Sequence, residues 1–133
     1  MNKYCLHTLI LILISITGCW KNDVGRSFYS SGKVLTEATI RNGVLDGPST
    51  MYYESGAKMS EAVYKSGLLS GTSTSFYESG HKKAQAEYSD GLLDGWSIGW
   101  SEDGTLQTKA CFNAGRLIFQ STKTDLIKEC VRG

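Results

Sequence analysis

The sequence has little of what most catalytic and nucleic-acid-binding proteins depend on. Its 133 residues include 2 His, and 14 basic residues nearly balance 13 acidic ones, which gives a formal net charge of +1. Because a protein needs a concentrated positive field to hold a phosphate backbone, this balance excludes a nucleic-acid partner. His81 follows Gly80 at a predicted loop tip, where a lone exposed His is far more often solvated than catalytic.

Catalytic and cofactor motifs are also missing. The sequence contains no phosphate-binding loop of the Walker or dinucleotide type. One turn histidine and few cysteines do not make up a Cys-His or Ser-His-Asp set. The carboxylates of Glu54, Glu78 and Glu102 fall in predicted turns, where they punctuate a repeat. We therefore expect no enzyme, no small-molecule substrate, no cofactor and no metal site.

No apolar run is long enough to cross a bilayer. The longest stretch, residues 9–16, is much shorter than the roughly 20 apolar residues that a transmembrane helix needs. Lys3 precedes it, and small polar residues followed by Cys19 come after it. This order predicts a cleaved secretory signal over residues 1–18.

The end of that segment, Ile16-Thr17-Gly18-Cys19, resembles the lipobox of bacterial lipoproteins. The resemblance implies that Cys19 carries fatty acyl chains and is the first mature residue; the alternative is an ordinary secretory signal with a Cys there by chance. Two or more acyl chains anchor a protein stably. Residue 20 is Trp, not the Asp of the enteric inner-membrane retention signal, so the resemblance favours the outer membrane where the cell has one.

A polar tether is predicted between this anchor and the folded domain. Residues 19–27 carry few apolar side chains. Eight fully extended residues span at most roughly 30 Å, so the domain is expected to sit close to the membrane surface.

Glycine is abundant, and it is periodic. Gly32, Gly56, Gly80 and Gly104 recur every 24 residues, and Gly43, Gly67, Gly91 and Gly115 keep the same period. Another ladder, Gly47, Gly71 and Gly95, ends at Phe119. Alanine keeps the period as well, at positions 38, 62, 86 and 110. So many columns in register predict four 24-residue repeats over residues 28–119.

The sequence of each repeat predicts β-hairpins. Dipeptides ending in Gly alternate at intervals of 11 and 13 residues, and Asn-Gly and Asp-Gly are the strongest short-range hairpin signals. Side chains alternate between a constant small or aromatic set and a drifting polar set, as on the two sides of a strand. The fold prediction is all-β, an antiparallel hairpin meander with the alanine and aromatic columns toward the core.

Pairing across the turn predicts the strand register. A two-residue turn at Asn42-Gly43 places Ile40 opposite Leu45 and Ala38 opposite Gly47. Glycine inside a strand usually marks a bulge, which would change the later alternation. Whether the Tyr52 column or the Tyr53 column faces inward therefore stays open.

The repeat resembles a known family. The residues that carry the resemblance are Ala86-Glu87-Tyr88-Ser89-Asp90-Gly91-Leu92-Leu93-Asp94-Gly95-Trp96-Ser97. They are similar to the MORN repeat, and more so to its bacterial variant, whose members are often named as antitoxins. The chain departs from the motif by small-for-small changes, Ala for the first Gly and Ser for the last. The resemblance implies a non-catalytic meander of roughly two strands per repeat, and it implies no ligand-binding residue.

The C-terminal residues 120–133 are predicted to cap the last strand as a short helix or turn. Thr124 suits a helix N-cap and Asp125 a first turn. Cys111 and Cys130 are the cysteines left once Cys5 leaves with the signal and Cys19 is acylated. An exported protein meets an oxidising compartment, so we expect them to form a disulfide; two free thiols or a metal pair are the alternatives.

The expected function is therefore binding. Candidate contact residues lie in the drifting column, where repeats differ most: Leu35, Met59, Lys83 and Gln107, with Trp96 nearby. For any one of them, packing into a thin core is the competing interpretation. The chain is expected to be a membrane-anchored scaffold that binds a protein of the cell envelope. An immunity or antitoxin-like inhibitor of an effector acting in the envelope is the alternative.

Overall fold

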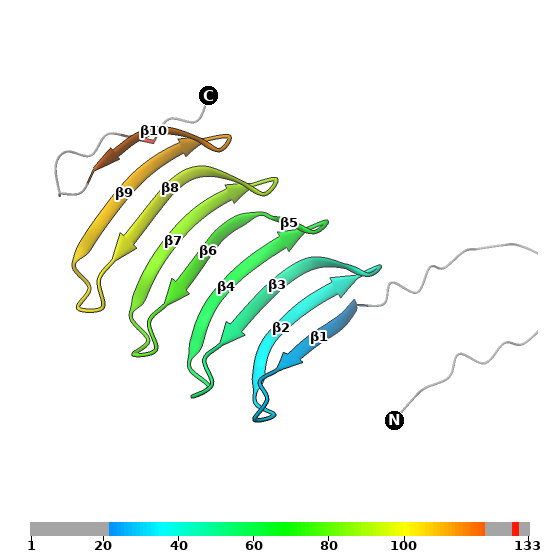
Figure 1. Cartoon of the computed structure of the whole chain (residues 1–133). Coiled ribbons are helices and arrows are strands. Elements are labelled where there is room, and N and C mark those ends of the chain that lie inside the picture. Colours follow the sequence, from blue (N-terminus) through cyan, green and yellow to red (C-terminus); the bar gives the residue numbers. More distant parts are fainter. Residues whose placement is uncertain (1–21, 122–128, 131–133) are drawn as a thin grey trace, which may run out of the picture.

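The computed structural model describes residues 22–121 and 129–130 (Figure 1), and these residues form strands and turns without a helix. Ten strands build one antiparallel sheet in which sequence neighbours lie side by side, except that the two-residue β5 pairs beside β6 on β4. The all-β hairpin meander is thus confirmed. No helix in the described part could span a membrane. Residues 122–128 of the predicted cap lie outside the described part, so the cap is not confirmed.

Two kinds of segment alternate through the repeats. A strand of eight residues follows each lower turn in Figure 1. The segment after each upper turn, called the long strand below, spans nine residues in three repeats, is divided into β5 and β6 in one of them, and is the six-residue β10 in the last. The strands are β1 (Asn22–Phe28), β2 (Val34–Arg41), β3 (Val44–Tyr52), β4 (Lys58–Lys65), β5 (Leu68–Leu69), β6 (Gly71–Phe76), β7 (Lys82–Ser89), β8 (Leu92–Trp100), β9 (Leu106–Asn113) and β10 (Arg116–Ser121).

The first strand corrects one prediction. Residues 22–27 were expected to be tether, but Asn22–Phe28 is the edge strand β1, paired with β2 from Asn22 opposite Arg41 onward. Polar and charged side chains are common in an edge strand, because one of its edges faces water and not another strand. The sheet therefore begins three residues after Cys19, a distance of at most about 11 Å when fully extended.

Two kinds of turn join the strands. At one end, both central residues take positive φ, as at Asn42 (51°) and Gly43 (80°). This is the two-residue hairpin that the sequence predicts, and its twist matches that of the strands. At the other end only the glycine has positive φ, and Gly56 donates to the carbonyl of Tyr53 at 2.8 Å. These are longer turns of the type I plus glycine-bulge kind.

A bulge overturns part of the predicted register. Ile40 pairs with Leu45 as expected, but Ala38 pairs with Ser49 and not with Gly47. Gly47, at φ 136°, lies in an excursion of the long strand, and it pairs with Tyr64 on the other side. The excursion shifts the register by two residues, which restores the alternation.

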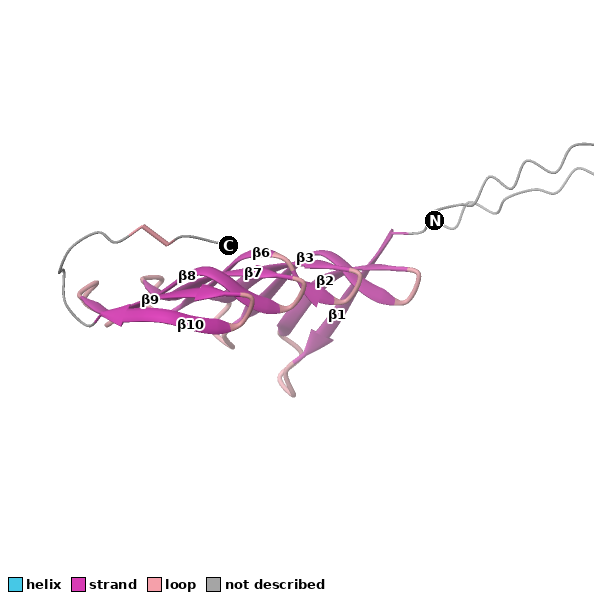
Figure 2. Cartoon of the chain, turned by 90° about the horizontal axis from the view of Figure 1, so that it is seen from above, coloured by secondary structure: helices cyan, strands magenta, loops and turns pink. Residues whose placement is uncertain are grey.

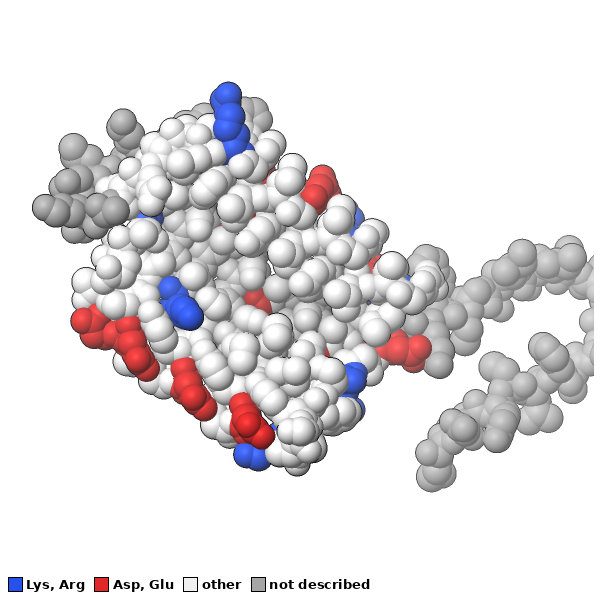
Figure 3. All heavy atoms as spheres, viewed as in Figure 1, with Lys and Arg blue, Asp and Glu red and all other residues white. Residues whose placement is uncertain are grey.

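The register separates the sheet into two faces. We call one the alanine face, because Ala38, Ala62, Ala86 and Ala110 pair there with Ser49, Ser73 and Ser97. We call the other the charged face, because a row of residues paired from strand to strand crosses it: Arg26, Glu37, Thr50, Glu61, Thr74, Gln85, Ile98 and Lys109. In the view of Figure 1, charged side chains are sparse over the middle of the sheet, and carboxylates line one rim (Figure 3).

The core is thin, since no second layer covers either face in the described part (Figure 2). Ala38 and Ala110 are buried on the alanine face, and Thr74 and Cys111 on the charged face. Most aromatic side chains are only half-buried. Each hairpin packs on its neighbours, as in other repeat proteins.

The open question about the two aromatic columns has a structural answer. Tyr52 lies on the charged face, where its hydroxyl reaches Glu37. The hydroxyls of Tyr29, Tyr53 and Tyr77 instead bridge repeats. They donate to the backbone carbonyls of Tyr52, Phe76 and Trp100 at 2.7, 2.7 and 2.9 Å. The tyrosines of this column, spaced by 24 residues, thus hydrogen-bond each repeat to the next.

Candidate protein-binding surfaces

Four of the predicted contact residues share a position that the sequence does not reveal. The pairing skips Leu35 in β2, Met59 in β4, Lys83 in β7 and Gln107 in β9. Each is the extra residue of a β-bulge near the longer turn. A bulge leaves its extra residue unpaired and disturbs the alternation of side chains.

Two of these residues contact other side chains than Trp96 does. The Lys83 ammonium lies 5.6 Å from the ring centroid of Tyr77, and Gln107 Nε2 donates to Ser101 Oγ at 3.2 Å. Tyr77 and Ser101 begin the longer turns that follow Phe76 and Trp100. Trp96 pairs with Cys111 on the charged face. That these five residues contact a partner stays a prediction.

Trp96 is held in a cluster of its own. Its ring meets Phe119 edge-on with centroids 5.5 Å apart, and the Lys109 ammonium lies 4.0 Å from its centroid. Beneath it, Cys111 is fully buried and forms a disulfide with Cys130. The predicted disulfide is confirmed. Trp96 therefore packs against residues of β9 and β10 at the C-terminal end of the sheet.

A row of exposed apolar side chains was missed by the sequence reasoning. Val44, Leu68 and Leu92 follow the two-residue turns at 24-residue spacing, and they are 48%, 49% and 52% exposed. The site of a Cβ on Gly91 would be 3.5 Å from Leu68, and that of a Cβ on Gly115 would be 3.6 Å from Leu92, so these two leucines reach the turn of the next hairpin. The signal was present, because these positions pair with the drifting Arg41, Lys65 and Ser89.

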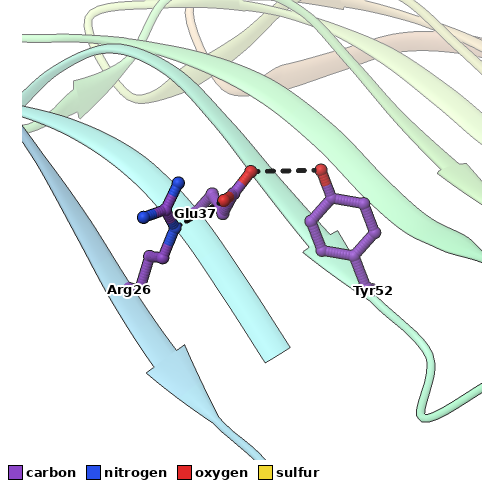
Figure 4. Close-up of polar contacts among 3 residues, drawn as sticks. All are labelled: Arg26, Glu37 and Tyr52. Atoms are coloured by element: carbon purple, nitrogen blue, oxygen red, sulfur yellow. Dashed lines mark hydrogen bonds and ion pairs between the residues drawn. The ribbon is translucent and has the colours of Figure 1, made fainter. Parts of the chain in front are cut away.

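At the first repeat, a hollow of about 390 Å³ opens beside Glu37 and Tyr52. Glu37 Oε1 accepts from Arg26 Nε at 2.6 Å, and its other oxygen faces the Tyr52 hydroxyl at 3.4 Å (Figure 4). The carboxylate thus lies between a guanidinium of the edge strand and an aromatic ring of β3. Both charged side chains remain partly exposed, at 54% for Arg26 and 34% for Glu37.

The rim of the longer turns is acidic. Glu54, Glu78 and Glu102 stand exposed at equivalent places. In the last turn, Asp103 Oδ1 accepts from Ser101 Oγ at 2.6 Å and from the Thr105 amide at 2.9 Å. These hydrogen bonds stabilise the ionised form and lower the pKa of Asp103 to about 2. His81 Nδ1 lies 2.6 Å from the Glu102 carbonyl oxygen, so the ring is used in the joint between turns.

The residues that the structure describes contain no group of three or more His, Cys, Asp or Glu side chains able to hold a metal ion. The carboxylates of Glu37, Glu61 and Asp103 each accept a hydrogen bond from a nearby cation or hydroxyl. The described residues thus form a surface of aromatic rings, half-exposed aliphatic side chains and separate charges, which suits contact with another molecule.

Comparison with protein families agrees with the repeat geometry. The model of the MORN repeat variant matches residues 45–66 and 69–90. These two segments of the chain are thus similar to the MORN repeat variant. Each match runs from the leucine of a long strand through the longer turn to the next two-residue turn, so the MORN unit begins in one hairpin and ends in another. Comparison with curated proteins and with solved structures finds no match.

Proposed function

We propose that the chain is a bacterial lipoprotein whose MORN-type sheet binds a protein of the cell envelope without turning over a substrate. The observation that carries this proposal is the exposed row of Val44, Leu68 and Leu92. Apolar side chains that line up over three hairpins and stay half-exposed are the kind of surface that a protein partner covers. MORN-type repeats are generally scaffold modules, which agrees with this proposal.

The proposed anchor would hold this surface near the membrane. Cys19 precedes β1 by three residues, so acyl chains on Cys19 would keep the β1 edge within about 11 Å of the lipid attachment. Confinement to one surface raises the effective concentration of the module toward partners on the same membrane. Neighbouring strands lie about 5 Å apart, so the later hairpins would extend progressively from the edge strand.

Lipidation is tested by labelling growing cells with a fatty-acid analogue. We expect label on the wild-type protein and an intact mass that lacks residues 1–18. Cys19→Ser should lose the label. Cys5→Ser is the matched control and should keep it. Label that persists in Cys19→Ser, or a mature mass that includes residues 1–18, contradicts the anchor.

Partner binding is tested by cross-linking and capture from intact envelopes. Replacing Leu68 and Leu92 together by Ser should reduce the yield of a specific envelope protein and leave the circular dichroism spectrum and melting temperature unchanged. Met51→Ser is the control, because Met51 is 37% exposed on the alanine face. If capture survives the double substitution, the apolar row is not the contact surface.

The same capture separates the immunity-like alternative from a scaffold. A captured effector whose toxicity in the envelope is relieved by this chain would favour inhibition, in keeping with the resemblance to antitoxin-named repeats. A captured envelope protein without toxicity would favour a scaffold. A toxin-like reading frame beside the gene would point the same way as the first outcome.

A further inference from the structure

The first two repeats each carry a glutamate and an aromatic ring at equivalent positions. Glu37 with Tyr52 in the first repeat corresponds to Glu61 with Phe76 in the second, 24 residues later in each case. In the second repeat a third residue completes the arrangement. Lys58 Nζ donates to Glu61 Oε2 at 2.6 Å and lies 5.8 Å from the ring centroid of Phe76.

The second repeat therefore contains an ammonium held between a carboxylate and an aromatic ring. A cation near a ring face is attracted by the negative potential of the π-system, and an opposite charge within hydrogen-bonding distance adds to this. The hydrogen bond from Lys58 to Glu61, and the charge of Glu61, raise the pKa of Lys58. The chain thus supplies its own example of how this carboxylate and ring hold a lysine.

In the first repeat the lysine is replaced. Val34 occupies the equivalent position and pairs with Phe28 across the sheet, as Lys58 pairs with Tyr52. The branched side chain of Val ends close to the backbone and carries no cation. The hollow of about 390 Å³ lies here, lined by Val34, Glu37 and Tyr52 together with Lys33 and two turn glycines. Lys33 Nζ donates to the Glu54 carbonyl at 2.7 Å, which engages it at the rim.

Arg26 replaces the missing lysine only in part. It reaches Glu37 Oε1 from the edge strand, on the side of the carboxylate away from Tyr52 (Figure 4). The Oε2 oxygen and the Tyr52 ring correspond to the two groups that hold Lys58. Oε2 accepts from the Tyr52 hydroxyl at 3.4 Å, and both residues line the hollow. An incoming cation can therefore bind without displacing Arg26.

We propose that this hollow binds a lysine side chain of a partner protein, with its ammonium at Glu37 Oε2 and its alkyl stem along Val34 and the ring of Tyr52. The site would supply one polar contact for the protein binding proposed above. The proposal depends on that proposed function only in taking the lysine from a partner protein. An exposed ion pair and one cation–π contact are each weak, so we expect a free lysine analogue to bind in the millimolar range.

The test is an NMR titration of the purified protein with Nα-acetyl-lysine-N′-methylamide. We expect saturable shifts of the Tyr52 ring and the Glu37 amide. The norleucine analogue has the same alkyl stem without the charge and should cause none. Val34→Lys should fill the hollow internally and abolish the shifts, and Val34→Met, of similar length but neutral, should retain them.

A second variant tests the same idea by gain of binding. Lys58→Val should vacate the second repeat and create a further set of saturable shifts at Glu61 and the Phe76 ring. This outcome does not depend on whether Val34→Lys folds. It would show that the carboxylate and ring alone define the site.

Two outcomes would overturn the proposal. One is the absence of saturable shifts in both the wild-type protein and Lys58→Val. The other is equal binding of ethanolamine, which would assign the hollow to any primary ammonium, including a lipid headgroup. Neither outcome bears on capture of an envelope protein through Leu68 and Leu92, so this proposal and the proposed function fail separately.

Discussion

At the scale of single residues, equivalent glycines of one column have different surroundings. Gly47 and Gly71 both have positive φ, at 136° and 82°. A Cβ on Gly47 would stand 2.9 Å from Thr39 Cβ, whereas a Cβ on Gly71 would meet nothing within 4 Å. The Thr39 Cβ is bonded directly to the backbone of β2, so it cannot move aside without moving the strand.

We therefore expect Gly47→Ala to lower the free energy of unfolding more than Gly71→Ala does. Both variants should suffer backbone strain of order 1–3 kcal/mol, and Gly47→Ala should add a steric cost. Thermal melts of the two variants measure the difference. If they melt together, the close approach of β2 and β3 at Gly47 is not a constraint on this sheet.

Asp103 shows how a turn residue acquires a pH dependence. Its pKa of about 2 arises first from the Ser101 hydroxyl and then from the Thr105 amide. Because the folded pKa lies below the unfolded value, Asp103 stabilises its turn above the unfolded pKa. That contribution is lost as the pH falls toward 2.

An NMR titration of the Asp103 carboxyl should therefore show a midpoint near 2, below the ordinary value of 3.8. Ser101→Ala removes the leading hydrogen bond and should raise the midpoint toward the ordinary value. Ser79→Ala is the control, because Ser79 occupies in the preceding repeat the position that Asp103 occupies in the last one. This variant should leave the midpoint of Asp103 unchanged. A wild-type midpoint near 3.8 would contradict the turn geometry.

At the scale of elements, the last hairpin differs from the others because Phe119 replaces the glycine of its column. The excursion of the long strand shrinks there: Phe112 pairs with Leu117 and Cys111 with Phe119. Phe119 is thereby turned to the charged face, where it meets Trp96. The disulfide to Cys130 sits at the same place and fastens the chain end to β9.

Reduction of this disulfide should destabilise the sheet. The cysteines are separated by 19 residues, and closing a loop of that size contributes about 3 kcal/mol in the chain-entropy model. The wild-type protein should melt at a lower temperature with reductant, and Cys130→Ala should melt at the same temperature with and without it. Non-reducing peptide mapping should recover the two cysteine peptides joined; two alkylatable thiols in the native protein would refute the bond.

At the scale of the whole molecule, the sheet grows in one dimension by equivalent hairpins. Sequence neighbours are the partners throughout the order from β1 to β10. In such an architecture stability is approximately a sum of repeat terms and neighbour terms. One repeat can therefore be removed without disturbing the rest, provided that the period is kept.

We expect deletion of residues 56–79, one period of 24 residues, to leave a folded sheet that is narrower and melts at a lower temperature. The deletion joins Ser55 to Gly80 and so restores a longer turn. Deletion of residues 56–67, half a period, is the control: it would remove one strand and its turn, and it should unfold the sheet beyond the junction. Far-ultraviolet circular dichroism and thermal melts distinguish the two. Equal tolerance of both deletions would contradict the hairpin meander.

Periodic glycine and alanine were enough to predict the repeat, the strand content, the two-residue turns and the pairing of Ile40 with Leu45, because turn chemistry and strand alternation are local. The cysteine count and the predicted export signal together predicted the disulfide. The binding surface was not predictable in the same way. An unpaired bulge residue changes the side to which its neighbours point, and the sequence does not record how many residues a bulge absorbs.

The composition, the period and the type of turn were thus determined by the sequence itself, since each depends on residues close together in the chain. The tertiary structure decided what depends on pairing between distant strands. It placed residues 22–27 in the sheet, it brought Trp96 beside Phe119 and Cys111, and it brought Glu37 between Arg26 and Tyr52. A residue's face and neighbours are set by the register of the strand beside it, and that register is an outcome of packing.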